Sequence, residues 1–221
     1  MNNKGTIIAL AWPDTLVIKE GKWYDIPLKI LGFLKNGYYK AGHAAMLLIN
    51  HETKVVEYFD FGRYHTPKKM GRVRDKYTDP DVEIITKASI ENDKIVNLEM
   101  LLKELSVKKS THGEGRLIAS EKLIKNFNKA FDKAKLIQER EAIPYGPFNI
   151  NGTNCSRFVA KVSRSSDIGL LRKLLIKIPY TLSPTPFSNV KIINDYGYYY
   201  EVKNKIVTKK RNRLFLFKKE K

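Results

Sequence analysis

A polar loop gives way to an apolar helix in one short stretch, Asn151-Gly152-Thr153-Asn154-Cys155-Ser156-Arg157-Phe158-Val159, which holds the chain's single cysteine. Phe158 and Val159 begin an apolar helical pattern, so we expect Cys155 at or near a helix N-terminus. There the positive end of the helix dipole and the free backbone N–H groups favour a thiolate. A buried structural cysteine would more naturally lie mid-helix, so we interpret Cys155 as a nucleophile.

A nucleophilic cysteine needs a base, and His43 is the candidate that differs from the other histidines. It follows Gly42 and opens the apolar run 44–49, a position from which a side chain can project past the end of a sheet into a cleft. The remaining histidines lie in turns, loops or at a strand end, namely His51, His65 and His112. From position alone, a catalytic base and a core imidazole bonded to backbone remain equally open for His43.

An imidazole base also needs an acceptor that orients it, and the next expected strand, 55–61, offers Glu57 and Asp60. An odd number of positions separates them, so in a regular strand they face opposite sides of the sheet and only one can meet His43. Glu57 lies among apolar residues, where a carboxylate is costly unless it is paired. We therefore expect Glu57 to orient His43, with Asp60 as the alternative.

Two of these segments resemble a known family of enzymes. The run 42–49 followed by Val55-Val56-Glu57-Tyr58 looks like the histidine strand and third-residue strand of NlpC-type papain-fold enzymes. The run Asn154-Cys155-Ser156-Arg157-Phe158-Val159 resembles the nucleophile motif of the lecithin:retinol acyltransferase-like branch, which is circularly permuted. In that branch, as here, histidine precedes cysteine in the chain, whereas ordinary papain-like and NlpC-type peptidases have the reverse order. The sequence differs from the acyltransferases that it resembles at position 57, where it has Glu57 and they have histidine.

The resemblance implies an α+β, papain-like, circularly permuted NlpC-type domain, with an antiparallel sheet packed on helices. It also implies a hydrolase or acyltransferase that attacks an amide, ester or thioester through an acyl-enzyme. Cys155 would be the nucleophile, His43 the base and then the acid, and Glu57 (or Asp60) the orienting group. Tyr145 and Asn154, which flank the nucleophile loop, would contact the substrate. The substrate class stays open among small molecules, peptides and lipids.

The whole chain, 1–221, is expected to form a single domain of 221 residues. Short apolar or β-branched runs predict strands at 6–12, 43–49, 55–61, 190–202 and 205–217. Leucines at helical spacing predict one helix from Leu98, and a second pattern predicts a longer helix over 123–137 with Ser120 as its cap. The expected parts are a hairpin at 41–62, a helical insertion at 97–140, a nucleophile loop and helix at 143–165, and a C-terminal extension at 169–221.

Charge and cysteine content restrict the other function classes. The net charge is +18, which favours anionic partners, but the lysines are spread along the chain and only Lys203–Lys221 is a dense basic cluster. We expect no nucleic acid as the main partner and leave an anionic membrane surface open. One cysteine excludes an internal disulfide, and no secretory signal is recognisable, so we expect a cytoplasmic protein rather than a cell-wall peptidase.

No ligand set for a metal and no glycine-rich phosphate loop is recognisable, so we expect no metal and no cofactor. The oligomeric state is not readable from the sequence. Two readings of another class remain as alternatives. The first alternative is an inactive papain-fold module that binds an anionic partner, and the second is a nucleic-acid-binding protein that uses its basic C-terminal tail.

Overall fold

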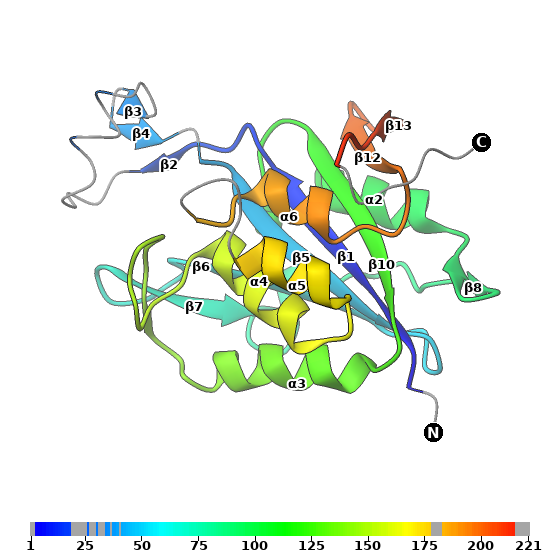
Figure 1. The fold of residues 1–221 in the computed structure, drawn as a ribbon. Coiled ribbons are helices and arrows are strands. Elements are labelled where there is room, and N and C mark those ends of the chain that lie inside the picture. The colour runs from blue at the N-terminus through cyan, green and yellow to red at the C-terminus, as the bar shows by residue number, and fades with distance from the viewer. Residues whose placement is uncertain are drawn as a thin grey trace.

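A central antiparallel sheet organises the chain, as the computed structural model shows (Figure 1). The structure describes residues 3–18, 26, 30, 34, 35, 37–39, 41–177 and 183–214. The main sheet has eight strands in the order β11-β7-β6-β5-β1-β10-β12-β13. Their bounds are β1 Gly5–Trp12, β5 His43–Asn50, β6 Val56–Gly62, β7 Met70–Arg74, β10 Leu117–Ile124, β11 Ile143–Pro144, β12 Tyr198–Lys203 and β13 Ile206–Arg211.

Smaller elements complete the described chain. A three-stranded sheet combines β2 (Val17–Ile18), β3 (Leu34–Lys35) and β4 (Tyr38–Tyr39), and a two-stranded one combines β8 (Ile90–Glu91) and β9 (Lys94–Ile95). The α-helices are α2 Leu98–Val107, α3 Phe127–Gln138, α4 Cys155–Ser165, α5 Leu170–Lys177 and α6 Pro186–Ile192, with two 3-10 turns at η1 Pro80–Val82 and η2 Lys109–Thr111. None of the helices in these described ranges is long and apolar enough to cross a membrane.

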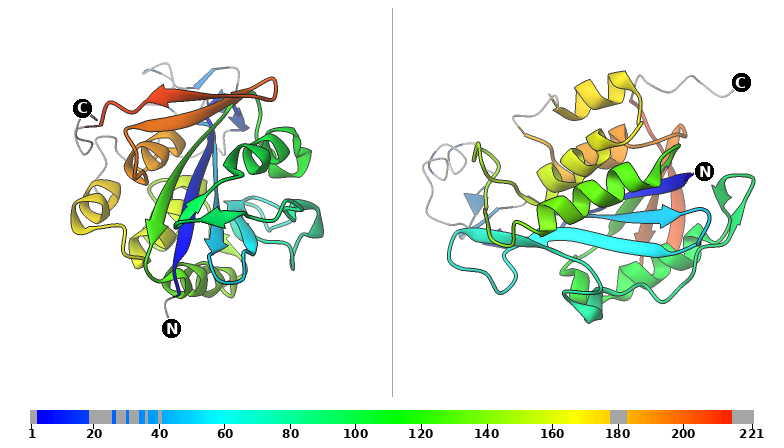
Figure 2. Two further views of the ribbon diagram at one scale, coloured as in Figure 1. Left: turned by 90° about the vertical axis from the view of Figure 1, so that its right-hand side faces the viewer. Right: turned by 90° about the horizontal axis from the view of Figure 1, so that it is seen from below.

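The sheet separates two hydrophobic cores, because its middle strands are buried on both faces. β1 is buried along its whole length, and it pairs with β5 on one side and β10 on the other. On one face, α3 and α4 cover a core that includes Met46, Phe59 and Phe158. On the other face, α2 covers a core that includes Leu10 and Leu47. Figure 2 shows this layering, with α3 to α6 on one side of the sheet and α2 on the other.

The expected α+β class with an antiparallel sheet packed on helices is confirmed. The expected hairpin is also present, with β5 and β6 pairing from Ile49–Val56 to Ala45–Asp60. The expected helical insertion at 97–140 contains α2 and α3, but its middle is β10, a central strand of the sheet. Ser120 is therefore not a helix cap: it lies buried in β10, and its hydroxyl donates to the Val190 and Ile193 carbonyls.

The C-terminal segment 169–221 is not a separate appendage. It supplies α5, α6 and the two strands β12 and β13, which extend the main sheet beyond β10. The expected strand at 190–202 is shorter, because α6 runs to Ile192 and β12 begins at Tyr198. Part of the predicted basic tail lies on β13, and its residues 215–221 lie outside the described ranges.

Candidate active site

Cys155 is the first residue of α4, as the polar-to-apolar pattern predicts. Asn154 is the N-cap, and its side-chain oxygen accepts a hydrogen bond from the Arg157 amide at 2.8 Å. This bond fixes the start of the helix, so the Cys155 amide belongs to the first turn, where backbone N–H groups have no partner within the helix. The thiol lies against the sheet, with the residue 6% exposed.

His43, the first residue of β5, is the group that the structure brings to this thiol. Its side chain is hydrogen-bonded to that of Cys155, and the two influence each other's titration. Burial alone would raise the pKa of the Cys155 thiol, but the hydrogen bond and charge of His43 outweigh it and lower that pKa. The Ala44 amide and the Ser156 hydroxyl lower the thiol pKa further. These contacts favour a thiolate.

The backbone explains how the Ala44 amide can reach the thiol. β6 continues to Gly62, but its pairing with β5 stops at the pair Ala45–Asp60. The β5–β6 ladder therefore does not include Ala44, the residue whose amide hydrogen-bonds to Cys155. The N-terminus of α4 thus meets β5 where its pairing with β6 ends.

Asp60 is the carboxylate beside His43, with its Oδ2 3.3 Å from His43 Nε2. Burial of the pair would lower the pKa of His43, but the hydrogen bonds with Asp60 and Cys155 prevail and raise it to about 9. For Asp60, burial would raise the pKa, yet hydrogen bonds from His43 and Arg74 lower it to about 2. Both values favour an ionised Asp60 and a charged imidazolium at neutral pH. Because Nε2 faces Asp60, Nδ1 is the ring nitrogen left for the thiol.

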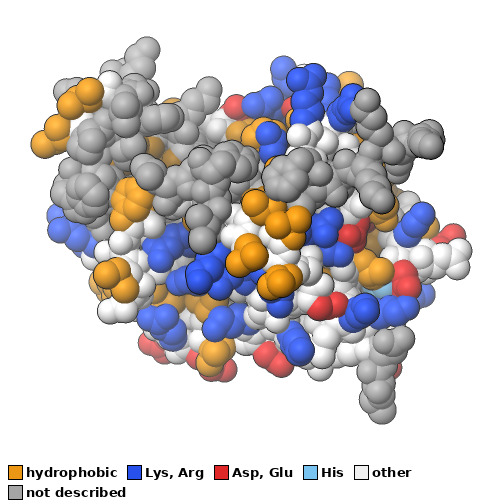
Figure 3. All heavy atoms as spheres, viewed as in Figure 1, with side chains coloured by type: hydrophobic (Ala, Val, Ile, Leu, Met, Phe, Trp, Pro, Cys, Tyr) orange, Lys and Arg blue, Asp and Glu red, His pale blue; other side chains and the backbone are white. Residues whose placement is uncertain are grey.

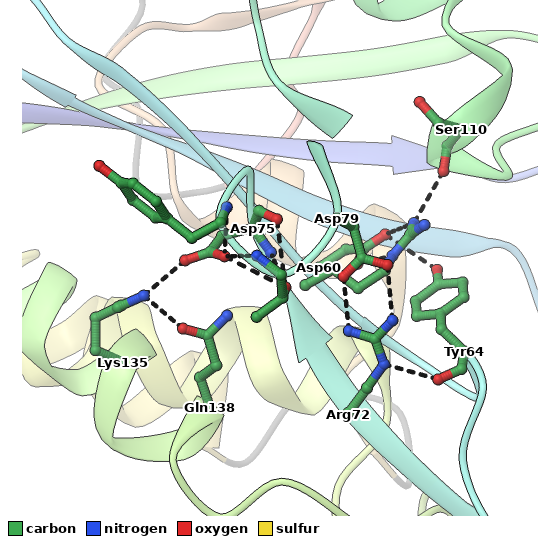
Figure 4. Close-up of polar contacts among 11 residues, drawn as sticks. Asp60, Tyr64, Arg72, Asp75, Asp79, Ser110, Lys135 and Gln138 are labelled. Atoms are coloured by element: carbon green, nitrogen blue, oxygen red, sulfur yellow. Dashed lines mark hydrogen bonds and ion pairs between the residues drawn. The ribbon is translucent and has the colours of Figure 1, made fainter. Parts of the chain in front are cut away.

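Asp60 is fully buried and accepts from several further donors. The hydroxyls of Tyr58 and Tyr64 each donate to Oδ2 at 3.0 Å. Arg74 donates through Nε to Oδ1 at 3.0 Å and through Nη2 to Oδ2 at 2.6 Å. Arg74 Nη2 also donates to the Ser110 carbonyl at 2.9 Å (Figure 4). A carboxylate with this many donors keeps one charge state and one orientation.

Glu57, the preferred candidate for orienting His43, does not contact it. It lies opposite Leu48 in the hairpin, on the other face of the sheet from Asp60 and far along the strand from His43. Its Oε1 lies 3.2 Å from Lys76 Nζ instead. The assignment of Glu57 to this position is therefore corrected in favour of the alternative, Asp60.

Aromatic packing supports the imidazole from residues that the sequence did not single out. Trp12, which pairs with His43 across the strands, stacks on its ring with centroids 5.8 Å apart. A methyl group at Gly113 would collide with the Trp12 indole, so that glycine is required for the close approach. Tyr64 stacks on His112 at 5.3 Å, and the Arg74 guanidinium lies 3.5 Å from the Tyr64 ring centroid. The loop 110–113 thus covers the residues that hold Asp60 and His43.

The two expected substrate contacts have structural roles as well. Asn154 uses its side-chain oxygen to cap α4. Tyr145 stacks on Phe61 at 5.9 Å and forms a bridge with Thr153, which closes the loop before the nucleophile. Phe148 and Ile150 in that loop are 38% and 93% exposed, so the loop before Cys155 presents apolar side chains to solvent. Of the other histidines, His51 lies beside Thr6 and Asp93, whereas His112 stacks on Tyr64.

The described part of the chain holds no group of three or more His, Cys, Asp or Glu residues arranged to bind a metal ion. The side chains that meet at the candidate site are a thiol, an imidazole and a buried carboxylate.

Comparisons with known proteins agree with this architecture. A search of curated proteins gave no match. A solved structure described as the type VI secretion system effector TseH superposes with a TM-score of 0.61 at 22% sequence identity. The alignment covers 95% of this chain and 99% of that one, which supports the papain-like fold over the whole length. The family model for type VI secretion system effectors of the TseH-like kind matches residues 7–168, which include His43, Asp60 and Cys155. The chain therefore belongs to the TseH-like family of type VI secretion system effectors.

Proposed function

We propose that this effector-family protein is a thiol enzyme, a hydrolase or acyltransferase that cleaves an amide, ester or thioester through an acyl-enzyme. The observation that carries the proposal is the series Cys155–His43–Asp60, in which each side chain hydrogen-bonds the next. A cysteine that only fills space in the core does not require an imidazole beside it. A histidine that is only structural does not require a buried, ionised carboxylate as its partner. Their alignment at the start of a helix is the arrangement that nucleophilic catalysis requires.

In this proposal each member has a role. The Cys155 thiolate attacks the substrate carbonyl carbon, and the first-turn amide of Cys155 is placed to stabilise the resulting oxyanion. The His43 imidazolium then gives its proton to the leaving group, and Cys155 remains acylated. In the second half, neutral His43 takes a proton from water or from another acceptor nucleophile, which attacks the acyl group and frees the thiol. Asp60 keeps the imidazole oriented through Nε2 and stabilises its charge throughout.

We also propose that the chain is related to one branch of the papain-fold enzymes. The order of histidine before cysteine and the Asn154–Val159 motif support kinship with the permuted, lecithin:retinol acyltransferase-like branch. Asp60 in place of histidine as the third group distinguishes this chain from those acyltransferases. We also propose that the protein folds in a reducing cytoplasm, where its free thiol stays reduced.

Selective alkylation tests the proposal without knowledge of the substrate. Native protein is treated with iodoacetamide at pH 7, and carboxamidomethylation of Cys155 is followed by intact-mass spectrometry. We expect the native thiol to react, and His43→Ala to slow its reaction at least about tenfold because the imidazolium that stabilises the thiolate is lost. His51→Ala is the matched control, since His51 lies away from the thiol. A native thiol that reacts only after denaturation would contradict the enzyme and leave the inactive module as the better reading.

A further inference from the structure

Four cationic side chains gather beside the loop that leads to the nucleophile. Two come from α4, one comes from α3, and one follows α3, and Figure 3 shows Lys and Arg side chains clustered over α4 on this face. Three of them donate to carbonyls of the loop 146–152. The bonds are Arg157 Nη1 to Gly146 O (3.1 Å) and Asn149 O (2.8 Å), Lys161 Nζ to Gly152 O (3.1 Å), and Arg140 Nη2 to Asn151 O (3.4 Å).

No acidic side chain among the described residues neutralises these cations. In the part of the chain that the structure describes, no carboxylate lies within ion-pair distance of Lys133, Arg140, Arg157 or Lys161. Burial, followed by the charges of Arg157, Arg140 and Lys133, lowers the pKa of Lys161 to about 8. Like charges held this close repel one another, and a bound anion would offset that repulsion. Elsewhere on α3 the pattern differs, since Lys135 pairs with Asp75 at 2.7 Å.

The cluster lies close to the reacting thiol in the chain. Gly152, whose carbonyl binds Lys161, is three residues before Cys155, so their Cα atoms are at most about 11 Å apart. Arg157 connects the same loop to the first turn of α4. An anion bound by these side chains would therefore sit beside the loop that shapes the approach to Cys155.

We propose that Arg140, Arg157 and Lys161 form a subsite for an anionic group, a carboxylate or a phosphate. Guanidinium groups match the geometry of both anions, and Lys161 adds a point charge. Lys133 adds to the positive field around them. Arg140 is exposed and Lys161 half-buried, so a ligand can reach both. The inference that the bound anion is part of the substrate rests on the proposed function. The inference that these side chains bind an anion does not.

Titration with inorganic phosphate at constant ionic strength, read from the amide signals of Gly146 and Gly152 by NMR, tests the subsite. We expect saturable shifts, and at least a fivefold weaker affinity in Lys161→Met and in Arg140→Gln. The control is Lys203→Met, which removes the same charge from an exposed position on β12. Shifts that do not saturate, or that weaken equally in all three variants, would mean an adventitious ion only and overturn the subsite.

Two further experiments complete the test. The first distinguishes a lipid headgroup from a small free anion as the ligand, and the second distinguishes failure of the subsite from failure of the proposed thiol enzyme. Vesicles of phosphatidylcholine, with and without phosphatidylglycerol, test the lipid source. Binding to the anionic vesicles without binding of phosphate would overturn a subsite for a small anionic group. The titration is repeated on Cys155→Ala, which we expect to bind phosphate as the native protein does. If phosphate binds while Cys155 stays unreactive in the native protein, the subsite stands and the thiol enzyme fails. If Cys155 reacts but phosphate does not bind, only the subsite is refuted.

Discussion

Arg74 and Asp60 lie directly opposite each other on β7 and β6 and form a two-point ion pair that is almost completely buried. The pair gives Asp60 a fixed counter-charge, so Oδ2, which also accepts from Arg74, can face His43 without the cost of an unpaired buried charge. The guanidinium is itself held by the Ser110 carbonyl and the Tyr64 ring. Arg74 is therefore a positioning residue for the candidate site.

Replacing Arg74 by methionine should destabilise the protein by about 3–5 kcal/mol, because it leaves a buried carboxylate without its partner. Urea denaturation at pH 7 measures the change. Arg74→Lys keeps the charge but loses the two-point geometry, so we expect an intermediate loss. Arg63→Met serves as the comparison, because Arg63 is only partly buried and its guanidinium donates to the Ile18 carbonyl in a solvent-exposed contact. A loss in Arg74→Met no larger than in Arg63→Met would contradict this account.

Asp60→Asn and Glu57→Gln should separate the two carboxylates of β6. The first removes the charge beside His43, so the pKa of His43 should fall and alkylation of Cys155 at pH 7 should slow about tenfold or more. The second removes a charge that pairs with Lys76, so the alkylation rate should stay within about twofold of the native rate. Equal effects of the two substitutions on that rate would argue against Asp60 as the orienting group.

The pH dependence of Cys155 alkylation should differ from that of an ordinary thiol. Because His43 lowers the pKa of Cys155, the thiolate should persist as the pH falls from 8 to 6. The rate should then change little over this range, whereas a thiol with an unshifted pKa would slow roughly tenfold per pH unit. Turnover, once a substrate is known, should fall above about pH 9, where His43 loses its proton and can no longer act as an acid. A tenfold loss of alkylation rate per pH unit below pH 8 would refute the pairing of a Cys155 thiolate with a His43 imidazolium.

Acid stability should report the charge of Asp60. Its pKa is lowered from 3.8 to about 2 in the folded protein, so the folded state is favoured at pH values above the unfolded pKa. This contribution, about 2 kcal/mol, should be lost as the pH falls from about 4 to 2. Urea denaturation across that range measures it, and Asp60→Asn should flatten the dependence. An unchanged slope in Asp60→Asn would assign the acid sensitivity to other groups.

Gly113→Ala should disturb the site from a distance, since the added methyl group collides with the Trp12 ring that stacks on His43. We expect a loss of about 1–3 kcal/mol in stability and a slower alkylation of Cys155. Gly197→Ala is the matched control, because a methyl group there meets open space. If both variants react at the native rate, Trp12 does not hold His43 in place.

Cys155 and His43 could be predicted because their signals are local. A capping asparagine and an apolar period mark the start of α4, and a glycine before an apolar run marks the start of β5. The choice between Glu57 and Asp60 depended on the register of the hairpin. The turn between Ile49 and Val56 sets that register, and only the structure shows that Ala45 opposes Asp60.

Other features depend on segments that are distant in the sequence. β10 was missed because a strand buried between two neighbours has apolar residues on both faces, which periodicity does not distinguish from a helix. Arg74, Tyr64 and Gly113 belong to separate segments, and their shared role arises only where the loop 110–113 covers the end of the sheet.

The separation of His43 and Cys155 by more than one hundred residues also has a consequence for biosynthesis. The β5–β6 hairpin consists of neighbouring segments and can form early, while α4 must dock across a long stretch of chain that includes β10. Loop closure over such a distance makes this docking a slow step. A nascent or partly folded chain would thus carry its base and its orienting acid without a usable nucleophile. On the proposed function, reactivity toward acyl groups would then arise only when folding is nearly complete.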